Sequence, residues 1–82
     1  MQSVQERIVE AAIQQNGQVY TGHKHYMIMQ KIYKETGEMI TGVEGFVTST
    51  GRFVTRAEAA RIAFKAGQIK LPKTELNSDD LY

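Results

Sequence analysis

The chain has 82 residues, with ten Lys and Arg against nine Asp and Glu, and it contains no cysteine. A domain of this size buries only about 60–65% of its unfolded surface, so its core is marginal without further association. The lack of cysteine excludes a disulfide framework and a thiolate metal site. A net charge of +1 argues against binding to extended nucleic acid, which requires many phosphate contacts.

Two further features concern the compartment. No segment approaches the ~20 apolar residues of a membrane span, and the first residues lack the apolar core of a signal peptide. We therefore expect a cytoplasmic protein that does not contact a membrane.

The first predicted element is an amphipathic helix over residues 3–15. Apolar residues such as Ile8 and Ala11 recur at helical spacing, with polar residues between them. Ser3 is the expected N-cap, and Asn16-Gly17 is the expected stop signal.

Next, residues 18–21 are predicted to form a short strand. Gly22 leads into a second helical pattern that ends at Thr36-Gly37. The apolar residues between 39 and 43 are interrupted by glycine, which predicts either a short strand or an ordered loop.

The strongest local pattern is a hairpin followed by a capped helix. Strand-forming residues flank a short loop at 48–51. Thr55 then stands three residues before Glu58, the capping-box spacing, and opens a predicted helix over 56–66 that Gly67 terminates. The alanine-rich face of this helix permits close packing on a sheet or on the same helix of another chain.

Together these elements predict an α+β fold: a small single domain with two or three helices packed on a short antiparallel sheet or hairpin. We assign residues 1–70 to this domain and residues 71–82 to a polar C-terminal tail. Two apolar residues at the end of the tail suggest that it docks on a surface, such as that of a neighbouring subunit.

Basic residues are concentrated in the second half of the chain, which favours a compact anionic ligand. Between residues 45 and 70 there are five Lys and Arg but one acid, Glu58. Arg56 falls in the first turn of the predicted helix, where a cation opposes the helix dipole unless an anion such as phosphate is bound there. Arg52, four residues earlier, could converge on the same anion. Alternatively, Arg56 is a solvated surface residue.

His23 and His25 form a second polar cluster with Thr21-Gly22. Zinc would require third and fourth ligands that the chain does not obviously supply, so we expect no metal and no cofactor. No nucleophile arrangement surrounds the histidines, although a ribonuclease-like pair is the sharpest catalytic alternative. One histidine contacting a ligand and a structural role at the helix start both stay open. Thr21-Gly22 is a weak phosphate-loop candidate.

Aromatic residues offer stacking surfaces for a nucleobase, an interaction worth ~1–3 kcal/mol per base. The candidates are Tyr20, Tyr26, Phe46 and Phe53. Core packing is the competing role for each of them in so small a domain.

Several segments together resemble a known family. They are Ile8–Ile13, Val19–His25, Gly45–Ile69 and the closing Asp-Asp-Leu-Tyr. This pattern is similar to the phage anti-Thoeris sponge family, whose members capture cyclic ADP-ribose signals made by bacterial TIR proteins. The resemblance implies a non-enzymatic protein that sequesters its ligand in the cytoplasm of an infected bacterial host. It also implies a homo-oligomer, dimer or hexamer, and in some members binding of CBASS cyclic oligonucleotides.

Carried over by position, the resemblance implies that Arg52 and Arg56 contact phosphate, with His25 and Phe46 as secondary contacts. Within the same matching segments, Thr48, Gly51 and Thr21 complete the expected ligand-binding set. The chain departs from the family in length, and it has histidine and lysine where an arginine is expected before His25.

Two rival functions remain open at this level. The chain could be a small phage inhibitor or regulator that docks on a host protein through an apolar and basic face. It could also be a phosphodiesterase that uses His23 and His25.

Overall fold

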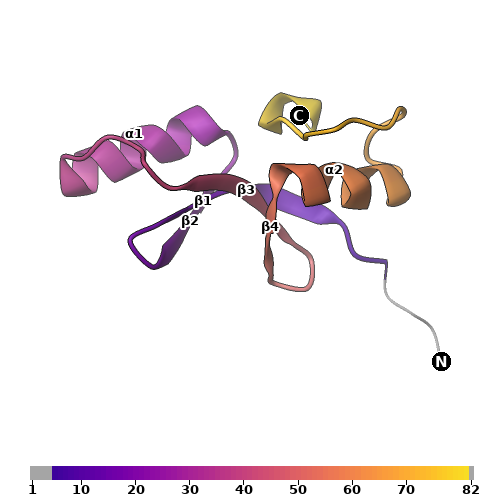
Figure 1. The fold of residues 1–82 in the computed structure, drawn as a ribbon, viewed down its shortest axis with the longest axis horizontal. Helices are drawn as coiled ribbons and strands as arrows, with labels where there is room; N and C mark the ends of the chain where they lie inside the picture. Colours follow the sequence, from indigo (N-terminus) through magenta and orange to yellow (C-terminus); the bar gives the residue numbers. More distant parts are fainter. Residues whose placement is uncertain (1–4, 82) are drawn as a thin grey trace.

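A four-stranded antiparallel sheet carries both α-helices of the described chain on one of its faces. The protein is represented by a computed structural model, which describes residues 5–81. In chain order the elements are β1 (Ile8–Gln15), β2 (Gln18–Gly22), α1 (His25–Thr36), β3 (Val43–Thr48), β4 (Phe53–Thr55), α2 (Arg56–Lys65) and the short 3-10 helix η1 (Ser78–Asp80). The strands pair in the order β2-β1-β3-β4. Figure 1 shows α1, α2 and the C-terminal segment on the same side of the sheet. The predicted α+β fold is confirmed.

The first predicted helix, over residues 3–15, is wrong. From Ile8 onward its residues form strand β1, while Ser3, the expected N-cap, lies outside the described residues. β1 pairs with β2 on one side and with β3 on the other. Cross-strand packing on both sides therefore overrides the helix preference of its alanines.

A bulge in β1 explains why its spacing looks helical. Ile8 pairs with Thr48 and Glu10 pairs with Val47, so one extra residue is inserted into β1 between these pairs. The insertion turns both Ile8 and Ala11 toward the core, three residues apart. Without a bulge, inward residues in a strand would be two apart. A three-residue interval is typical of a helix, and the prediction of a helix over residues 3–15 relied on this spacing.

Asn16 and Gly17 form the turn of a hairpin and not the end of a helix. Their φ angles are 54° and 76°, the left-handed values that a two-residue type I′ turn requires at both positions. The turn joins β1 to β2, and the strand predicted over residues 18–21 is confirmed.

The second helix and its stop are confirmed. α1 ends at Thr36, and Gly37 adopts the left-handed conformation with φ 72°, so that its N–H reaches the carbonyl of Tyr33. The connector that follows is a loop, and β3 begins at Val43, earlier than the predicted hairpin strand. The side chain of Gln15 holds this loop, since its Oε1 accepts from backbone N–H groups at 3.0 and 3.1 Å.

The β3–β4 hairpin and the helix after it also form as predicted. Thr55 caps α2, because its Oγ1 accepts from the N–H of Glu58 at 3.3 Å. Only this half of the predicted capping box forms, because the carboxylate of Glu58 is directed to Arg52 at 3.2 Å. At the other end, Gly67 has the left-handed φ of 76° expected of a C′ glycine.

The core lies between the sheet and the helices. Its largest fully buried side chains are Phe46, Ile13, Ile28, Ile32, Leu76 and Val54. The alanine-rich face of α2 is part of this core, so it packs on the sheet of its own chain. Small side chains there allow the helix to lie close to the strands.

The C-terminal segment returns to the domain that precedes it. Leu76 is fully buried, and its N–H donates to the carbonyl of Arg56 at 3.0 Å. Two ion pairs hold η1: Lys73 with Asp80 at 2.7 Å and Lys24 with Asp79 at 2.7 Å. The packed unit therefore extends beyond the predicted boundary at residue 70. Contact of the tail with a neighbouring subunit stays a prediction.

Candidate functional site

The predicted ligand residues fall into separate groups, and the first of these is part of the core. His25 begins α1 and is only 7% exposed, with its Nε2 2.8 Å from the carbonyl oxygen of Gly45. The ring of Phe46 meets the imidazole edge-on, with 5.0 Å between ring centroids. Phe46 is 0% exposed. In this fold neither face of the Phe46 ring reaches the surface, so stacking of Phe46 on a ligand would require the core to open, and that contact stays a prediction.

The second group surrounds the carboxylate of Glu6, next to the β3–β4 loop. Arg52 donates to both of its oxygens at 2.8 Å, and the hydroxyls of Thr48 and Thr50 donate at 2.6 and 2.7 Å. Gly51, with φ 87°, shapes the loop that brings these donors together. The predicted Arg52, Thr48 and Gly51 are thus neighbours, but the anion they bind is a side chain of the same protein.

These contacts shift the titration of Glu6. The hydrogen bonds from Arg52, then from Thr48 and Thr50, lower the pKa of Glu6 from its ordinary 4.5 to about 2. In turn, Glu6 raises the pKa of Arg52 above its already high value. The network joins the segment before β1 to the loop after β3.

The third group lies at the start of α2, where the sequence predicted an anion. The guanidinium of Arg56 donates through Nε to the carbonyl of Leu76 at 3.0 Å and through Nη2 to Oδ1 of Asn77. Thr55 already satisfies one free N–H of this helix terminus, and Glu58 supplies a negative charge in its first turn. The chain thus provides the acceptors that the prediction assigned to phosphate.

Thr21 belongs to none of these groups. It lies on β2, whereas Arg52 precedes β4 at the opposite edge of the sheet. Three strand spacings separate those edges, which is about 14 Å. The described structure therefore does not bring the predicted ligand set into one pocket, and contact of these residues with a ligand stays a prediction.

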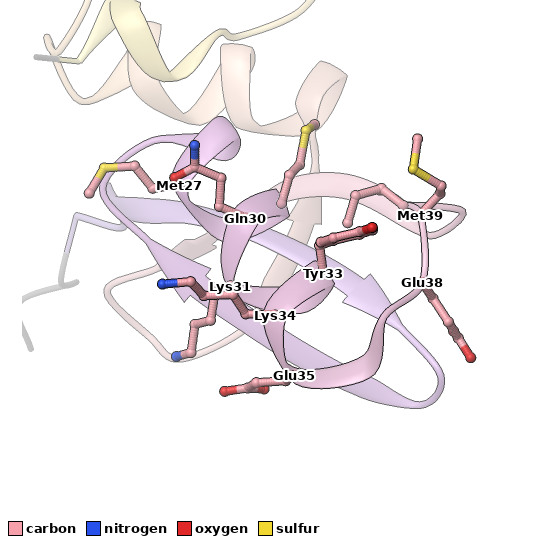
Figure 2. Close-up of a pocket in the computed structure, with 10 residues that line it drawn as sticks. Met27, Gln30, Lys31, Tyr33, Lys34, Glu35, Glu38 and Met39 are labelled. Atoms are coloured by element: carbon pink, nitrogen blue, oxygen red, sulfur yellow. The ribbon is translucent and has the colours of Figure 1, made fainter.

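A groove of about 1010 Å³ lies along the outer side of α1 and its connector to β3. Its charged lining residues are Lys31, Lys34, Glu35 and Glu38, and its apolar ones are Met27, Met29, Tyr33, Met39 and Ile40. Figure 2 shows Tyr33 and Met39 on one flank of α1, with Lys31 and Lys34 on the opposite flank. We call Met29, Tyr33, Met39 and Ile40 the Tyr33 patch.

Sequence reasoning missed the Tyr33 patch because a helical pattern by itself does not tell which apolar residues of α1 face the core and which face solvent. The buried stripe of this helix consists of His25, Ile28 and Ile32. Tyr33 is 59% exposed, and Met39, in the connector, is 76% exposed. A helix with more apolar residues than one stripe can hold is the signal that could have located this patch.

A family model of the phage T4 y16D protein matches residues 7–82. The chain belongs to the phage T4 y16D family. No curated protein and no solved structure matches the chain. The expectation of a phage protein is therefore confirmed for this y16D-family chain, and the comparisons add no support for a relationship to the anti-Thoeris sponges.

Two further observations on the y16D-family protein concern membranes and metals. None of the helices between residues 5 and 81 has the length and apolar character needed to span a bilayer. Over the same residues, no group of three or more His, Cys, Asp and Glu side chains is placed to hold a metal ion.

The Glu6 network makes the stability of the y16D-family protein depend on pH. The pKa of Glu6 is lower in the fold than in the unfolded chain. The ionised carboxylate of Glu6 therefore makes its full contribution to the free energy of unfolding above pH 4.5, and this contribution is lost as the pH falls toward 2. We expect the difference in free energy of unfolding between wild type and Glu6→Gln to be largest above pH 4.5 and to shrink below it. Urea titrations between pH 3 and 7 measure this difference.

Arg52→Gln tests the same network from the side of the cation. Arg52 is the largest cause of the lowered pKa of Glu6, so the free energy of unfolding of this variant should also differ from that of wild type most strongly above pH 4.5. A difference between wild type and Glu6→Gln that stays constant from pH 3 to 7 would show that the network does not hold Glu6 ionised.

Proposed function

We propose that this phage protein acts by docking on another protein through the Tyr33 patch, without catalysing a reaction. The exposure of the patch carries the proposal. Tyr33 and Met39 are large apolar side chains that face solvent side by side with further apolar lining. Leaving such side chains in water is unfavourable, and a contiguous exposed apolar patch commonly marks an interaction site.

The composition of the surface favours a protein as the partner. Tyrosine and methionine are enriched in protein interfaces, and tyrosine is frequent among the residues that dominate binding energy. Methionine adapts its shape to a partner because it is unbranched and flexible. Glu38, the residue before Met39, borders the patch, as a polar rim residue of an interface does (Figure 2).

Sequestration of a cyclic nucleotide, which the sequence resemblance implied, has weaker support. Glu6 already accepts from Nε and Nη2 of Arg52, and Leu76 and Asn77 accept from Nε and Nη2 of Arg56, so fewer guanidinium N–H groups are left for a phosphate. Phe46 would have to leave the core to stack on a base. The proposed docking requires no such rearrangement.

The histidines also favour binding over catalysis. His25 is buried and bonded to the carbonyl of Gly45, whereas His23 is exposed. A phosphodiesterase would need both imidazoles within reach of one phosphate. In this fold the two side chains occupy different environments.

Replacing Tyr33 and Met39 together by alanine should abolish the proposed docking while the protein stays folded. Both side chains are more than half exposed, so their loss removes few core contacts. We expect immobilised wild-type protein to retain a specific protein from infected-cell extract, and the purified partner to bind the double variant at least ~10-fold more weakly. Titration calorimetry with the purified partner measures the change.

A control variant with Phe64→Ala and Leu71→Ala removes two exposed apolar side chains outside the patch, and it should bind like wild type. The nucleotide alternative is tested by thermal shift with cyclic ADP-ribose isomers and cyclic dinucleotides. A stabilisation that Arg52→Ala abolishes and the Tyr33 and Met39 double variant retains would replace docking by sequestration.

A further inference from the structure

Strand β2 forms an edge of the sheet whose outer side is not paired within residues 5–81. It pairs with β1 alone and ends the strand order. Proteins usually protect such an edge with a charged residue, a proline or a bulge. The five residues of β2, Gln-Val-Tyr-Thr-Gly, include no charge and no proline, and their pairing with β1 is regular. The edge is therefore open to another strand.

The turn before β2 determines which backbone groups face outward. In a two-residue type I′ hairpin, the residues on either side of the turn form a hydrogen-bonded pair, here Gln15 with Gln18. Hydrogen-bonded positions then alternate along the strand, so Gln18 and Tyr20 direct their N–H and C=O groups to β1. Val19 and Thr21 direct theirs away from the sheet.

We propose that β2 pairs antiparallel with β2 of a second copy, about a two-fold axis at Tyr20, and joins two sheets into one. In this register Val19 of each copy lies opposite Thr21 of the other copy. Both residues have outward N–H and C=O groups, and in an antiparallel hydrogen-bonded pair each residue donates to and accepts from the other. The edge is complementary to itself, as a symmetric dimer requires.

Helix α1 favours a second copy over an unrelated extended segment. α1 packs on β1 and β2, so its axis lies about one strand spacing from the proposed two-fold axis. The two α1 helices would then run antiparallel about 10 Å apart, which is close to helix contact distance. An extended segment of another protein would pair with the edge but would bring no second helix.

The flank of α1 that would meet its copy carries charges of both signs. The connector to β3 follows the flank with Tyr33 and Met39, since β3 lies on the other side of β1 from β2. Lys31 and Lys34 lie on the opposite flank (Figure 2), and because β2 is on the side of β1 away from β3, this is the flank nearer β2. Glu35 follows them along the same helix, so two antiparallel copies can place unlike charges together. This association goes beyond the proposed docking and leaves the Tyr33 patch free.

The first test is the oligomeric state of the whole chain, measured by analytical ultracentrifugation from 5 µM to 500 µM. We expect a dimer for wild type and a monomer for Val19→Lys, which places two ammonium groups beside the proposed axis. Val43→Lys is the matched control: it makes the same change at an exposed valine of β3, away from the edge, and should stay dimeric. Circular dichroism establishes that both variants are folded.

The second test determines the register in which the two β2 strands pair. Because the chain has no cysteine, Val19→Cys and Thr21→Cys each introduce a single thiol. Opposite positions in a hydrogen-bonded pair have Cα atoms about 5.5 Å apart, within reach of a disulfide. Mixed under mild oxidation, the two proteins should form the mixed disulfide faster than either forms its own.

Two outcomes would overturn the proposal. One is a monomeric wild type at 500 µM, which would leave the edge open to a strand of a different protein. The other is a dimer that Val19→Lys does not disrupt and whose mixed disulfide has no kinetic advantage, which would place the interface elsewhere on the surface.

Discussion

Replacing Leu76 by alanine should lower the free energy of unfolding by about 2–5 kcal/mol. This side chain is fully buried among residues of the sheet and helices, although it belongs to the C-terminal segment. Its loss removes apolar contacts and leaves a cavity, since the surrounding core cannot collapse completely. The backbone of Leu76 also exchanges hydrogen bonds with Arg56, so the segment that crosses between α2 and α1 would loosen.

Urea unfolding followed by circular dichroism measures the loss, and Leu71→Ala is the matched control. Leu71 lies in the same segment but is 74% exposed, so its replacement should change the free energy of unfolding by about 0.5 kcal/mol or less. Equal effects for the two variants would mean that the segment after residue 70 does not belong to the folded unit.

Replacing Gly45 by alanine should be the second large perturbation, at about 1–3 kcal/mol or more. A Cβ atom at this position would overlap the carbonyl oxygen of Val54 in β4 and would lie 2.7 Å from Cζ of Phe53. The carbonyl is part of the backbone of a neighbouring strand, so it can move only by disturbing the β3–β4 pairing. The carbonyl of Gly45 also accepts from His25, and a shift of β3 would weaken that bond.

Gly22→Ala separates this steric effect from the general cost of removing a glycine. A Cβ atom there would lie 2.9 Å from Cγ1 of Ile28, an atom on a side chain that can adjust. We expect this variant to cost about 1 kcal/mol or less. Thermal unfolding of both proteins gives the comparison, and a Gly45→Ala protein as stable as Gly22→Ala would contradict the close approach of β3 and β4.

Elements whose signals lie next to one another in the chain were predicted well. Thr55 caps α2 because the N–H that it satisfies is only three residues away. Gly37 and Gly67 end their helices because a left-handed residue is needed there and glycine adopts it without strain. Asn16-Gly17 was the missed local signal, since this pair is the strongest sequence indication of a two-residue hairpin.

β1 could not be predicted from its own residues. Its alanines and its three-residue apolar interval both indicate a helix, and the bulge that creates this interval exists only when β3 lies beside it. Strand formation here depends on cross-strand contacts with β2 and β3. The intrinsic propensities of the residues in β1 do not include such contacts, so they could not indicate a strand.

At the candidate site, the two arginines show the same difference between what neighbouring residues indicate and what the folded chain decides. Local charge and helix position led to the prediction of a bound anion such as phosphate at Arg52 and Arg56, whereas in the fold both guanidinium groups donate to acceptors of the same chain. The identity of those acceptors depends on the folded chain: Glu6 is 46 residues from Arg52, and Leu76 is 20 residues from Arg56. Caps and turns depend on atoms a few residues apart, so the amino-acid order is sufficient to specify them. The partner of a charge, the outer face of α1 and the open edge of β2 depend on which distant segments pack together, because packing is what buries one side of an element and leaves the other exposed.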